Sequence, residues 1–180
     1  TELINTREEL EARSKELYQL ATTDSLTGLL NRRELLAQVG KVASQANRSG
    51  TTYAVLAVDV DFFKKVNDEH GHQAGDRVLV RLAQQLTAGR RTNDFVARIG
   101  GEEFILVLAD NDENSAFELA EKIRIAIAEH IVGDIPSTVS IGVVVSPKQA
   151  RMEFSELMAL ADSALYESKR TGRNKSTVIS

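Results

Sequence analysis

The sequence contains no cysteine among its 180 residues. This absence excludes disulfide bonds and thiolate zinc sites, and with them the class of small secreted domains that depend on such links. No apolar run reaches the roughly 20 residues of a membrane-spanning helix, and no signal peptide is visible. Internal repeats and low-complexity segments are also lacking. These absences predict a soluble, cytoplasmic segment without membrane contact.

The chain also lacks a strong charge of either sign. Its formal net charge is −4 at pH 7, which gives no broad cationic face of the kind that binds a nucleic acid polymer. A hydrophobic content of 42% in a chain of this length predicts one sizeable core with an appendage. Because the sequence starts at Thr1 rather than at methionine, we expect a longer protein with an upstream sensor domain, although tag removal or processing would give the same start.

The segment Gly-Gly-Glu-Glu at residues 100–103 lies between two short apolar runs, 95–99 and 104–108. A glycine pair in this position predicts a tight hairpin, because the favoured hairpin turns need positive φ and glycine adopts it without steric cost. Such a turn does not need two acids. If the second strand begins there, Glu102 and Glu103 point to opposite faces, and at least one is free to bind a cation. For this motif taken alone, a solvated turn is the alternative.

Another acidic pair follows the apolar run 53–58, whose length and β-branched content predict a buried strand. Asp59 and Asp61 lie at its carboxyl end, and the next segment, 77–86, repeats apolar residues at helical spacing. With a right-handed crossover, the strand 104–108 runs antiparallel beside the first strand, and Asp59 lies next to the two glutamates of the hairpin. Three clustered carboxylates repel each other unless divalent metal neutralises them, as two-metal phosphoryl and nucleotidyl transfer requires.

The first twenty residues carry a narrow apolar seam. Leu3, Leu10 and Leu17 recur at heptad spacing, and Leu20 follows three residues later. Two interpretations stay open for such a short repeat: a coiled coil that couples dimerisation to an upstream sensor, or a helix folded back on the domain. We expect this helix over residues 1–21, the domain over 22–180, and the linker between them at 20–31.

The remaining pattern predicts the fold class. Helical spacing of apolar residues indicates helices near 31–46, 113–129 and 154–169, and β-rich runs indicate strands over 138–145 and 176–179. Two strand-helix-strand units joined by the hairpin predict an α+β fold with a ferredoxin-like sheet flanked by helices. The last strand is then an extra edge, and the N-terminal helix is a stalk.

Six segments carry distinctive motifs, in the order DSLTGLLNR at 24–32, DVDFFKKVND at 59–68, GHQAGD at 71–76, RIGGEEF at 98–104, VSIG at 139–142 and ADSALYESKRTGRN at 161–174. In this order and spacing they resemble the successive signatures of the GGDEF domain, the diguanylate cyclase family. The resemblance covers roughly residues 22–180. It implies condensation of two GTP molecules to cyclic di-GMP with release of pyrophosphate, on a fold similar to the palm of nucleotidyl cyclases and polymerases.

The resemblance implies a two-metal site. Asp59, the backbone carbonyl of Val60, Glu102 and Glu103 would hold two Mg²⁺ or Mn²⁺ ions about 4 Å apart, one activating a 3′-hydroxyl and the other neutralising the triphosphate. Hard oxygen ligands suit both cations. Glu102 stands where the family name has aspartate, and its longer side chain still reaches a metal.

The same resemblance assigns residues to GTP. Asn67 and Asp76 are expected to bind guanine, because an amide offers donor and acceptor while a carboxylate accepts from the N1 and N2 hydrogens, which predicts GTP over ATP. Turn and helix-cap chemistry is the alternative for both residues. The other expected substrate contacts are Phe62, Phe63, Lys64, Gly100, Gly101, Lys169 and Arg173. At least one phenylalanine is expected in the core, and a helix C-terminus by itself explains the basic run 169–175.

Arg91 and Asp94 match the family's RxxD product-inhibition site, in which arginine forks onto phosphate and guanine while the aspartate accepts from guanine. We expect cyclic di-GMP bound there, with help from Lys122 of a neighbouring helix or subunit, to slow catalysis by holding two domains apart. Because one domain holds one GTP, product formation requires a homodimer whose copies face each other with twofold symmetry.

Two other classes of function stay open. A catalytically silent relative would bind GTP or cyclic di-GMP only as a receptor, but the intact Gly-Gly-Glu-Glu segment and Asp59 weigh against this. Another nucleotidyl cyclase or a polymerase-like palm would need a thumb, fingers and a template groove, for which the remaining length leaves no room. The product formed from GTP and Mg²⁺ distinguishes all three.

Overall fold

The computed structural model describes residues 2–130, 135–148 and 152–179. In chain order its elements are α1 (Glu2–Thr22), α2 (Arg32–Ser49), β1 (Ala54–Val60), α3 (Phe63–His70), α4 (His72–Ala88), β2 (Phe95–Arg98), β3 (Glu103–Leu108), α5 (Glu113–Glu129), β4 (Val139–Val145), α6 (Phe154–Arg170) and β5 (Ser176–Ile179). From α2 onward this is the predicted order, with the short helix α3 added. Within the described ranges, no helix combines the length and apolar character needed to cross a membrane.

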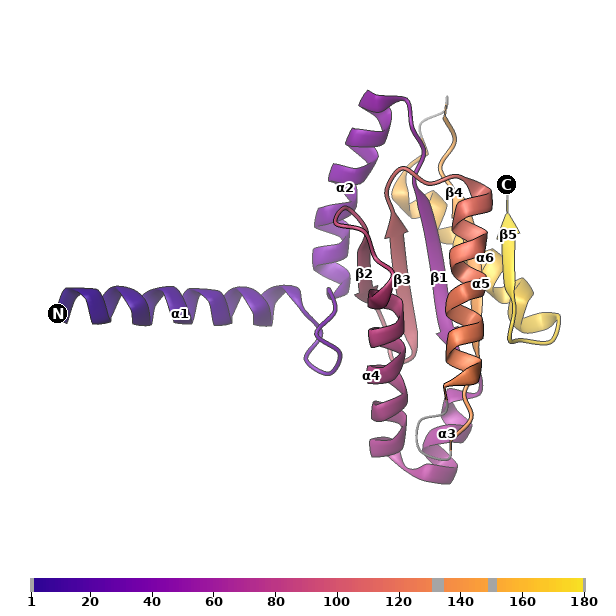
Figure 1. Cartoon of the computed structure of the whole chain (residues 1–180), viewed down its shortest axis with the longest axis horizontal. Coiled ribbons are helices and arrows are strands. Elements are labelled where there is room, and N and C mark those ends of the chain that lie inside the picture. The colour runs from indigo at the N-terminus through magenta and orange to yellow at the C-terminus, as the bar shows by residue number, and fades with distance from the viewer. Residues whose placement is uncertain (1, 131–134, 149–151, 180) are drawn as a thin grey trace.

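The five strands form one sheet in the order β2-β3-β1-β4-β5. The central strand β1 pairs antiparallel with both β3 and β4, β2 pairs antiparallel with β3, and β5 pairs parallel with β4. The first four strands therefore have the ferredoxin-like arrangement, and β5 adds an outer edge (Figure 1). The predicted α+β fold is confirmed.

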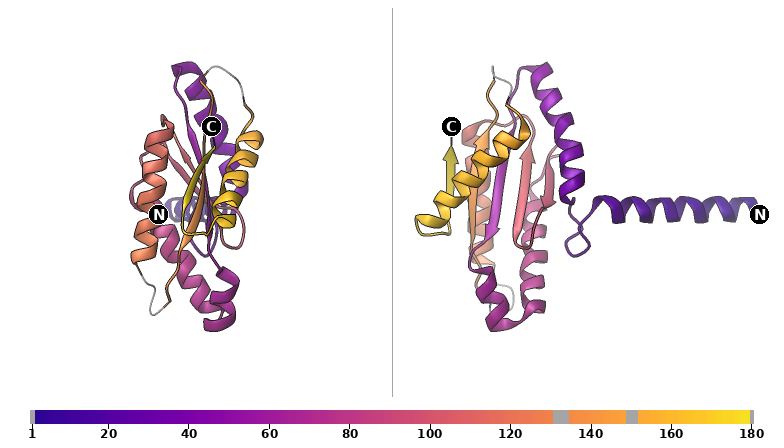
Figure 2. Two further views of the ribbon diagram at one scale, coloured as in Figure 1. Left: turned by 90° about the vertical axis from the view of Figure 1, so that its right-hand side faces the viewer. Right: turned by 180° about the vertical axis from the view of Figure 1, so that it is seen from behind.

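Helices cover both faces of the sheet. Helices α4 and α5 lie on one face and α2 and α6 on the other, as the edge-on view shows (Figure 2). Side chains of β1 alternate between the two cores: Leu56 and Val58 pack with α4 and α5, while Val55 and Ala57 pack with α2 and α6. Every residue of β1 is buried, which fits its central place between two antiparallel neighbours.

Helix α6 approaches β4 very closely at Gly142. A Cβ at this position would overlap the backbone of Ala161 and Leu165, so only glycine lets the helix lie this near to the strand. Because α6 runs on from this contact to Arg170, the close approach sets where its last turn meets the sheet.

Helix α1 projects from the domain rather than packing against it (Figures 1 and 2). Its described side chains from residue 6 to residue 20 are exposed, including Leu10 and Leu17 at 63% and 66%. The fold-back alternative is therefore wrong. The side chain of Leu3 lies outside the described part of the chain. Because α1 continues to Thr22, the linker predicted at 20–31 begins only after that residue.

The linker is an ordered turn against the edge of the sheet. Thr23 and Leu30 form an isolated bridge, and Leu30 pairs in parallel with Ala97 of β2. Asn31 caps α2 by accepting from the backbone N–H of Glu34 at 2.9 Å, and its amide donates to the carbonyl of Ala21 at the end of α1 at 2.9 Å. This turn thus fixes the exit of α1 relative to the domain.

Candidate functional site

The predicted acids of the first strand and the hairpin meet at one end of the sheet. Asp59, expected just after the strand, is the second-last residue of β1, and the strand register pairs it with Glu103 of β3. Residues directly opposite each other in an antiparallel pair place their side chains on the same face. The N–H of Val60 donates to the carbonyl of Glu102 at 3.4 Å. The predicted neighbourhood of Asp59 and the two glutamates is confirmed at the level of the backbone.

The hairpin turn differs from the prediction. Among the described residues the glycines with positive φ are 28, 50, 71 and 172, so the expected positive φ at Gly100 and Gly101 is wrong. The physical reason is that the backbone N–H of Ile99 donates to the carbonyl of Glu103 at 2.9 Å. This bond leaves a three-residue connection, 100–102, in place of a two-residue turn. Glu102 belongs to this connection and Glu103 begins β3, so they do not alternate along one strand.

Arg98 closes this connection. Its guanidinium donates to the carbonyl of Gly101 at 2.8 and 3.1 Å and to the carboxylate of Asp24 at 3.1 and 3.2 Å. Burial raises the pKa of Asp24, but the hydrogen bonds from Thr27 and from Arg98 outweigh this, and the pKa lies below its usual value. One side chain therefore links the hairpin between β2 and β3 to the turn that follows α1.

The two glycines leave different spaces. A Cβ at Gly100 would lie 2.5 Å from Oε2 of Glu103, whereas one at Gly101 would meet no atom within 4 Å. Gly100 thus makes room for the Glu103 carboxylate. The fold itself gives no reason for the missing side chain at Gly101.

Lys169 brings a cation to the acids from the last turn of α6. Its Nζ lies 3.0 Å from Oδ2 of Asp59, which is only 5% exposed. Burial is the main cause that raises the pKa of Asp59 to about 6; Lys169 opposes the shift, and Glu102 and Glu103 add to it. The three acids and the lysine therefore act on one another electrostatically.

Asp162 is a further acid at this site to which the sequence analysis gave no role. It lies seven residues before Lys169 on α6, a spacing that places both on one helix face and was visible in the sequence. The pKa of Asp162 is raised, chiefly by burial and next by the charge of Glu103, while Arg32 and Lys169 oppose the shift.

The donor chemistry fits a hard divalent cation. Among the described residues, no three histidine, aspartate or glutamate side chains converge as a complete metal-binding cluster, so the expected cluster of three carboxylates is not formed by side chains alone. Mg²⁺ is commonly held by one or two carboxylates together with substrate phosphates rather than by an all-protein cage. Asp59, Glu103 and the backbone carbonyl of Val60 provide that kind of partial set.

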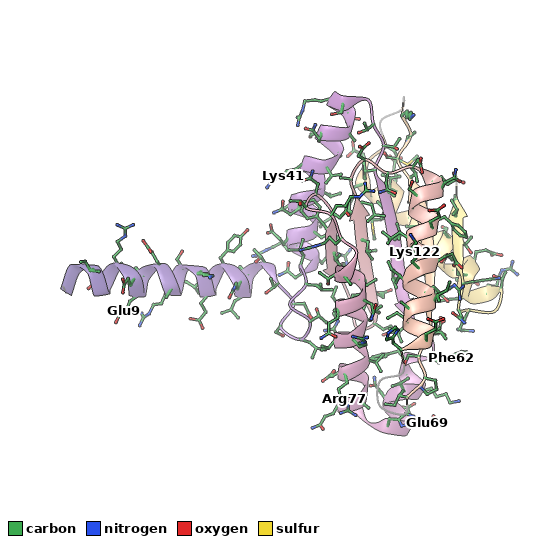
Figure 3. The ribbon with its side chains drawn as sticks, viewed as in Figure 1. Glu9, Lys41, Phe62, Glu69, Arg77 and Lys122 are labelled. Atoms are coloured by element: carbon green, nitrogen blue, oxygen red, sulfur yellow. The ribbon has the colours of Figure 1, made fainter. Side chains whose placement is uncertain are left out.

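The segment after Asp61 turns sharply into α3. Phe62 has a positive φ of 54°, and the residue is 60% exposed at the end of the domain where α3 lies (Figure 3). Phe63, the first residue of α3, is buried in the core, which confirms that one of the two phenylalanines packs there. Lys64 is exposed beside it.

Asn67 and Asp76 lie inside helices α3 and α4, so the turn and helix-cap alternative is wrong for both. Asn67 packs tightly against Gly75, where a Cβ would overlap Oδ1 of the amide. This Oδ1 is buried, and no described residue donates to it. A buried acceptor without a donor is costly, and Asp76, one residue after Gly75, is exposed. Oδ1 of Asn67 and the carboxylate of Asp76 are both hydrogen-bond acceptors.

The basic run after Lys169 ends α6 as a helix C-terminus, as predicted. Gly172 follows the cap residue Thr171 with a φ of 122°. Arg173 also has a positive φ, 61°, and its guanidinium carbon lies 4.5 Å from the centroid of the Phe62 ring. Lys169 and Arg173 therefore reach the end of β1 from the same direction.

In the RxxD segment, the aspartate shapes the loop. Asp94 is 4% exposed, and its two carboxylate oxygens accept from the backbone N–H groups of Arg91 at 2.8 Å and Ala109 at 3.1 Å. The Arg91 side chain is exposed. Lys122 is exposed on α5 (Figure 3), and no hydrogen bond or ion pair joins it to this loop in the described part of the chain.

Comparison with known proteins agrees with this geometry. The sequence profile of the family described as "Diguanylate cyclase, GGDEF domain" matches residues 21–175. A diguanylate cyclase of Vibrio cholerae serotype O1 is 39% identical over 162 residues, which are 89% of this chain and 50% of that protein. The probable diguanylate cyclase DgcT of Escherichia coli strain K12 is 40% identical over 166 residues, which are 88% of this chain and 36% of that protein. The chain thus spans half or less of these curated relatives.

Two solved structures are similar over most of the chain. The coiled coil and GGDEF domain of DgcB from Caulobacter crescentus, in complex with c-di-GMP, has 30% identity and a TM-score of 0.87, covering 99% of this chain and 97% of that one. The active GGEEF domain of a diguanylate cyclase from Vibrio cholerae has 35% identity and a TM-score of 0.78, covering 83% and 97%. With the family profile spanning the residues that build the site, the chain belongs to the diguanylate cyclase family of GGDEF domains.

Proposed function

We propose that this chain is a diguanylate cyclase that condenses two GTP molecules into cyclic di-GMP and two pyrophosphates. The observation that carries the proposal is the pairing of Asp59 with Glu103 at the end of β1 and β3, with Lys169 3.0 Å from Asp59. Acids and a cation at one strand end suit a triphosphate that binds as a metal complex. The glutamate in place of aspartate at 102 is compatible with activity, because a GGEEF domain is among the similar structures described as active.

The acids have a defined part in this proposal. Asp59, Glu102, Glu103 and the carbonyl of Val60 would hold two Mg²⁺ or Mn²⁺ ions, which would supply activation of the attacking 3′-hydroxyl and neutralisation of the triphosphate charge. In the free protein Lys169 balances the charge of Asp59. When the nucleotide binds, the same ammonium is available to its phosphates, beside the guanidinium of Arg173.

Recognition of guanine is assigned to Asn67 of α3 and Asp76 of α4. The buried Oδ1 of Asn67 has no donor, and the carboxylate of Asp76 is exposed. Both are acceptors, and guanine presents N1–H and N2–H donors where adenine does not present the same pattern. The site therefore favours GTP over ATP, because an adenine leaves the buried acceptor unpaired.

Catalysis is proposed to occur between two copies of the chain. Cyclic di-GMP forms when each of two nucleotides attacks the other, and each copy offers one set of the acids Asp59 and Glu103. Twofold symmetry brings two identical sites together face to face. The exposed leucines of α1 supply a seam through which two copies can associate as a coiled coil.

Product inhibition is proposed at the RxxD loop. Asp94 holds the loop through its two backbone hydrogen bonds, and the exposed guanidinium of Arg91 is free to bind a phosphate of cyclic di-GMP. Lys122 is proposed as an additional contact from a neighbouring subunit.

The direct test is to incubate the protein with Mg²⁺ and either GTP or ATP and to identify the products by chromatography and mass spectrometry. Cyclic di-GMP from GTP, with no cyclic dinucleotide from ATP, is expected. Binding of GTP or cyclic di-GMP without turnover would replace the proposal by a receptor role. A different nucleotide product would assign the chain to another class of nucleotidyl cyclase.

A further inference from the structure

Asp61 is a buried acid beside the site for which the proposed reaction has no role. It is 4% exposed. Its Oδ1 accepts from the hydroxyl of Ser140 at 2.6 Å, and its Oδ2 accepts from the hydroxyl of Thr138 at 2.7 Å and from the backbone N–H of Asn174 at 2.9 Å. These bonds join the end of β1 to the beginning of β4 and to the turn after α6.

The turn held by Asp61 has an unfavourable backbone. Residues 172–174 have consecutive positive φ values of 122°, 61° and 44°. Glycine tolerates this, but Arg173 and Asn174 carry a Cβ and need support from outside the turn. Three hydrogen bonds supply such support. The backbone N–H of Asn174 donates to Asp61 in a part-buried bond, Arg124 donates to the Asn174 side chain at 3.1 Å, and the backbone N–H of Arg173 donates to the carbonyl of Ser168 at 2.9 Å.

The residues next to this bond also face each other. Phe62 follows Asp61, Arg173 precedes Asn174, and the guanidinium of Arg173 lies 4.5 Å from the centre of the Phe62 ring. A cation–π contact at an exposed ring is weak. The part-buried hydrogen bond from Asn174 to Asp61 is therefore the stronger of two adjacent links between the same segments. Together with the bond from the backbone N–H of Arg173 to the carbonyl of Ser168 at 2.9 Å, it holds the backbone of Arg173 in place.

We propose that Asp61 is a positioning residue for nucleotide binding, which holds the turn 172–174 so that Arg173 meets the terminal phosphates of GTP beside residues 62–64. The inference rests on the proposed function, since it takes Arg173 as a phosphate ligand. Asp61 contacts no substrate itself. It acts through the backbone of Asn174, and its effect therefore depends on the presence of the Arg173 side chain.

The dependence of the Asp61 effect on the Arg173 side chain is tested by steady-state kinetics in the full chain. The variants are Asp61→Ala, Arg173→Ala and the double variant. Each single variant is expected to raise KM for GTP about tenfold, the loss typical of one charge-assisted contact, with a smaller change in kcat. The double variant is expected to be no worse than Arg173→Ala. Asp112→Ala is the control: this aspartate also accepts a backbone hydrogen bond, as the cap of α5, but beyond the opposite end of β3. Additive effects of the two substitutions would overturn the proposal.

Hydrogen exchange without nucleotide gives a readout that does not depend on turnover. The amide of Asn174 is expected to exchange about tenfold faster in Asp61→Ala than in the wild type, with no change in Asp112→Ala. If Asp61→Ala does not fold, Asp61→Asn is used; it keeps one acceptor oxygen, so the same change is expected at smaller size. Unchanged exchange at 171–176 would overturn the positioning role. A wild-type chain that makes no cyclic di-GMP would reject the proposed function instead, while the exchange result still decides whether Asp61 holds the turn.

Discussion

Single residues of the hairpin between β2 and β3 differ in what the fold requires of them. The clearest case is Gly101, where a Cβ would meet no protein atom within 4 Å and the backbone is not left-handed. The missing side chain leaves space open on the outside of the hairpin. We interpret this space as the approach of the bound nucleotide.

Gly101→Ala is therefore expected to leave the free energy of unfolding within about 0.5 kcal/mol of the wild type. Its turnover of GTP should fall by about 100-fold, the size of effect that displacement of a reacting group by about 1 Å can cause. Denaturant unfolding and initial-rate measurements on the same preparation check both parts. Retained turnover in this variant would remove Gly101 from the substrate contacts.

Arg91 and its neighbour Arg90 provide a matched pair for the inhibition site. Both side chains are exposed, and the backbone N–H of Arg91 donates to the carboxylate of Asp94 at 2.8 Å. Arg91→Ala should raise the cyclic di-GMP concentration that halves the rate by about tenfold or more, because a charge-assisted bond to phosphate is lost. The initial rate without product should not change. An inhibition curve equal to that of Arg90→Ala would refute the assignment.

Local sequence pattern could predict these individual positions only in part. The motifs identified Asp59, Glu103, Lys169 and Arg173, which lie together in the structure. The role of Asp61 could not be predicted in this way, because its partner Asn174 is 113 residues away in sequence. The positive φ of Phe62 likewise depends on the tertiary setting, since a bulky residue does not favour it locally.

At the scale of helices and strands, periodicity predicted α5 and β5 with the observed bounds and placed β1 within two residues. It did not predict α3, which has only eight residues, two of them buried. So short a helix depends on packing against α4 and the sheet rather than on its own propensity. The close contact of α6 with β4 was also not visible in the sequence, because it depends on how two distant elements approach.

Substitutions at two glycines test the close contact between α6 and β4 through their effects on stability. Gly142→Ala should destabilise the protein by about 1–3 kcal/mol or more, because the added Cβ overlaps the backbone of α6. Gly40→Ala, at an exposed position of α2 where a Cβ meets nothing within 4 Å, should instead stabilise by about 0.5–1 kcal/mol. Thermal or denaturant unfolding measures both. Equal effects of the two substitutions would contradict the description of the α6–β4 interface.

The turn between α1 and α2 gives a pH-dependent prediction. The folded state holds the pKa of Asp24 below its usual value, so its contribution to stability is present above about pH 4, the unfolded pKa, and is lost as pH falls further. Asp24→Asn should cost about 1–2 kcal/mol at neutral pH, and the difference from the wild type should shrink toward about pH 3. Denaturant unfolding at both pH values checks this. A difference that does not depend on pH would show that the charge of Asp24 is not involved.

At the scale of the whole molecule, the projecting helix α1 carries the surface through which we expect a second copy to associate. Its seam residues Leu10 and Leu17 face solvent in a single chain, and within the described residues β1 and β3 bring together one pair of acids, Asp59 and Glu103. Association through α1 would bury the seam and raise the local concentration of the second domain. The turn after Thr22 is joined to the hairpin through Arg98, so hydrogen bonds connect the end of α1 with the site.

The rate of cyclic di-GMP formation as a function of total chain concentration tests the central claim that two copies, each with Asp59, Glu103 and one GTP, make one product. The rate should rise with the square of chain concentration while monomers dominate and become linear once dimers form. The double variant Leu10→Glu/Leu17→Glu should shift the crossover from quadratic to linear dependence to a higher chain concentration. Glu9→Ala on the same helix should leave the crossover concentration unchanged (Figure 3). A rate that is linear from the lowest concentrations at which the chain is monomeric would contradict the account.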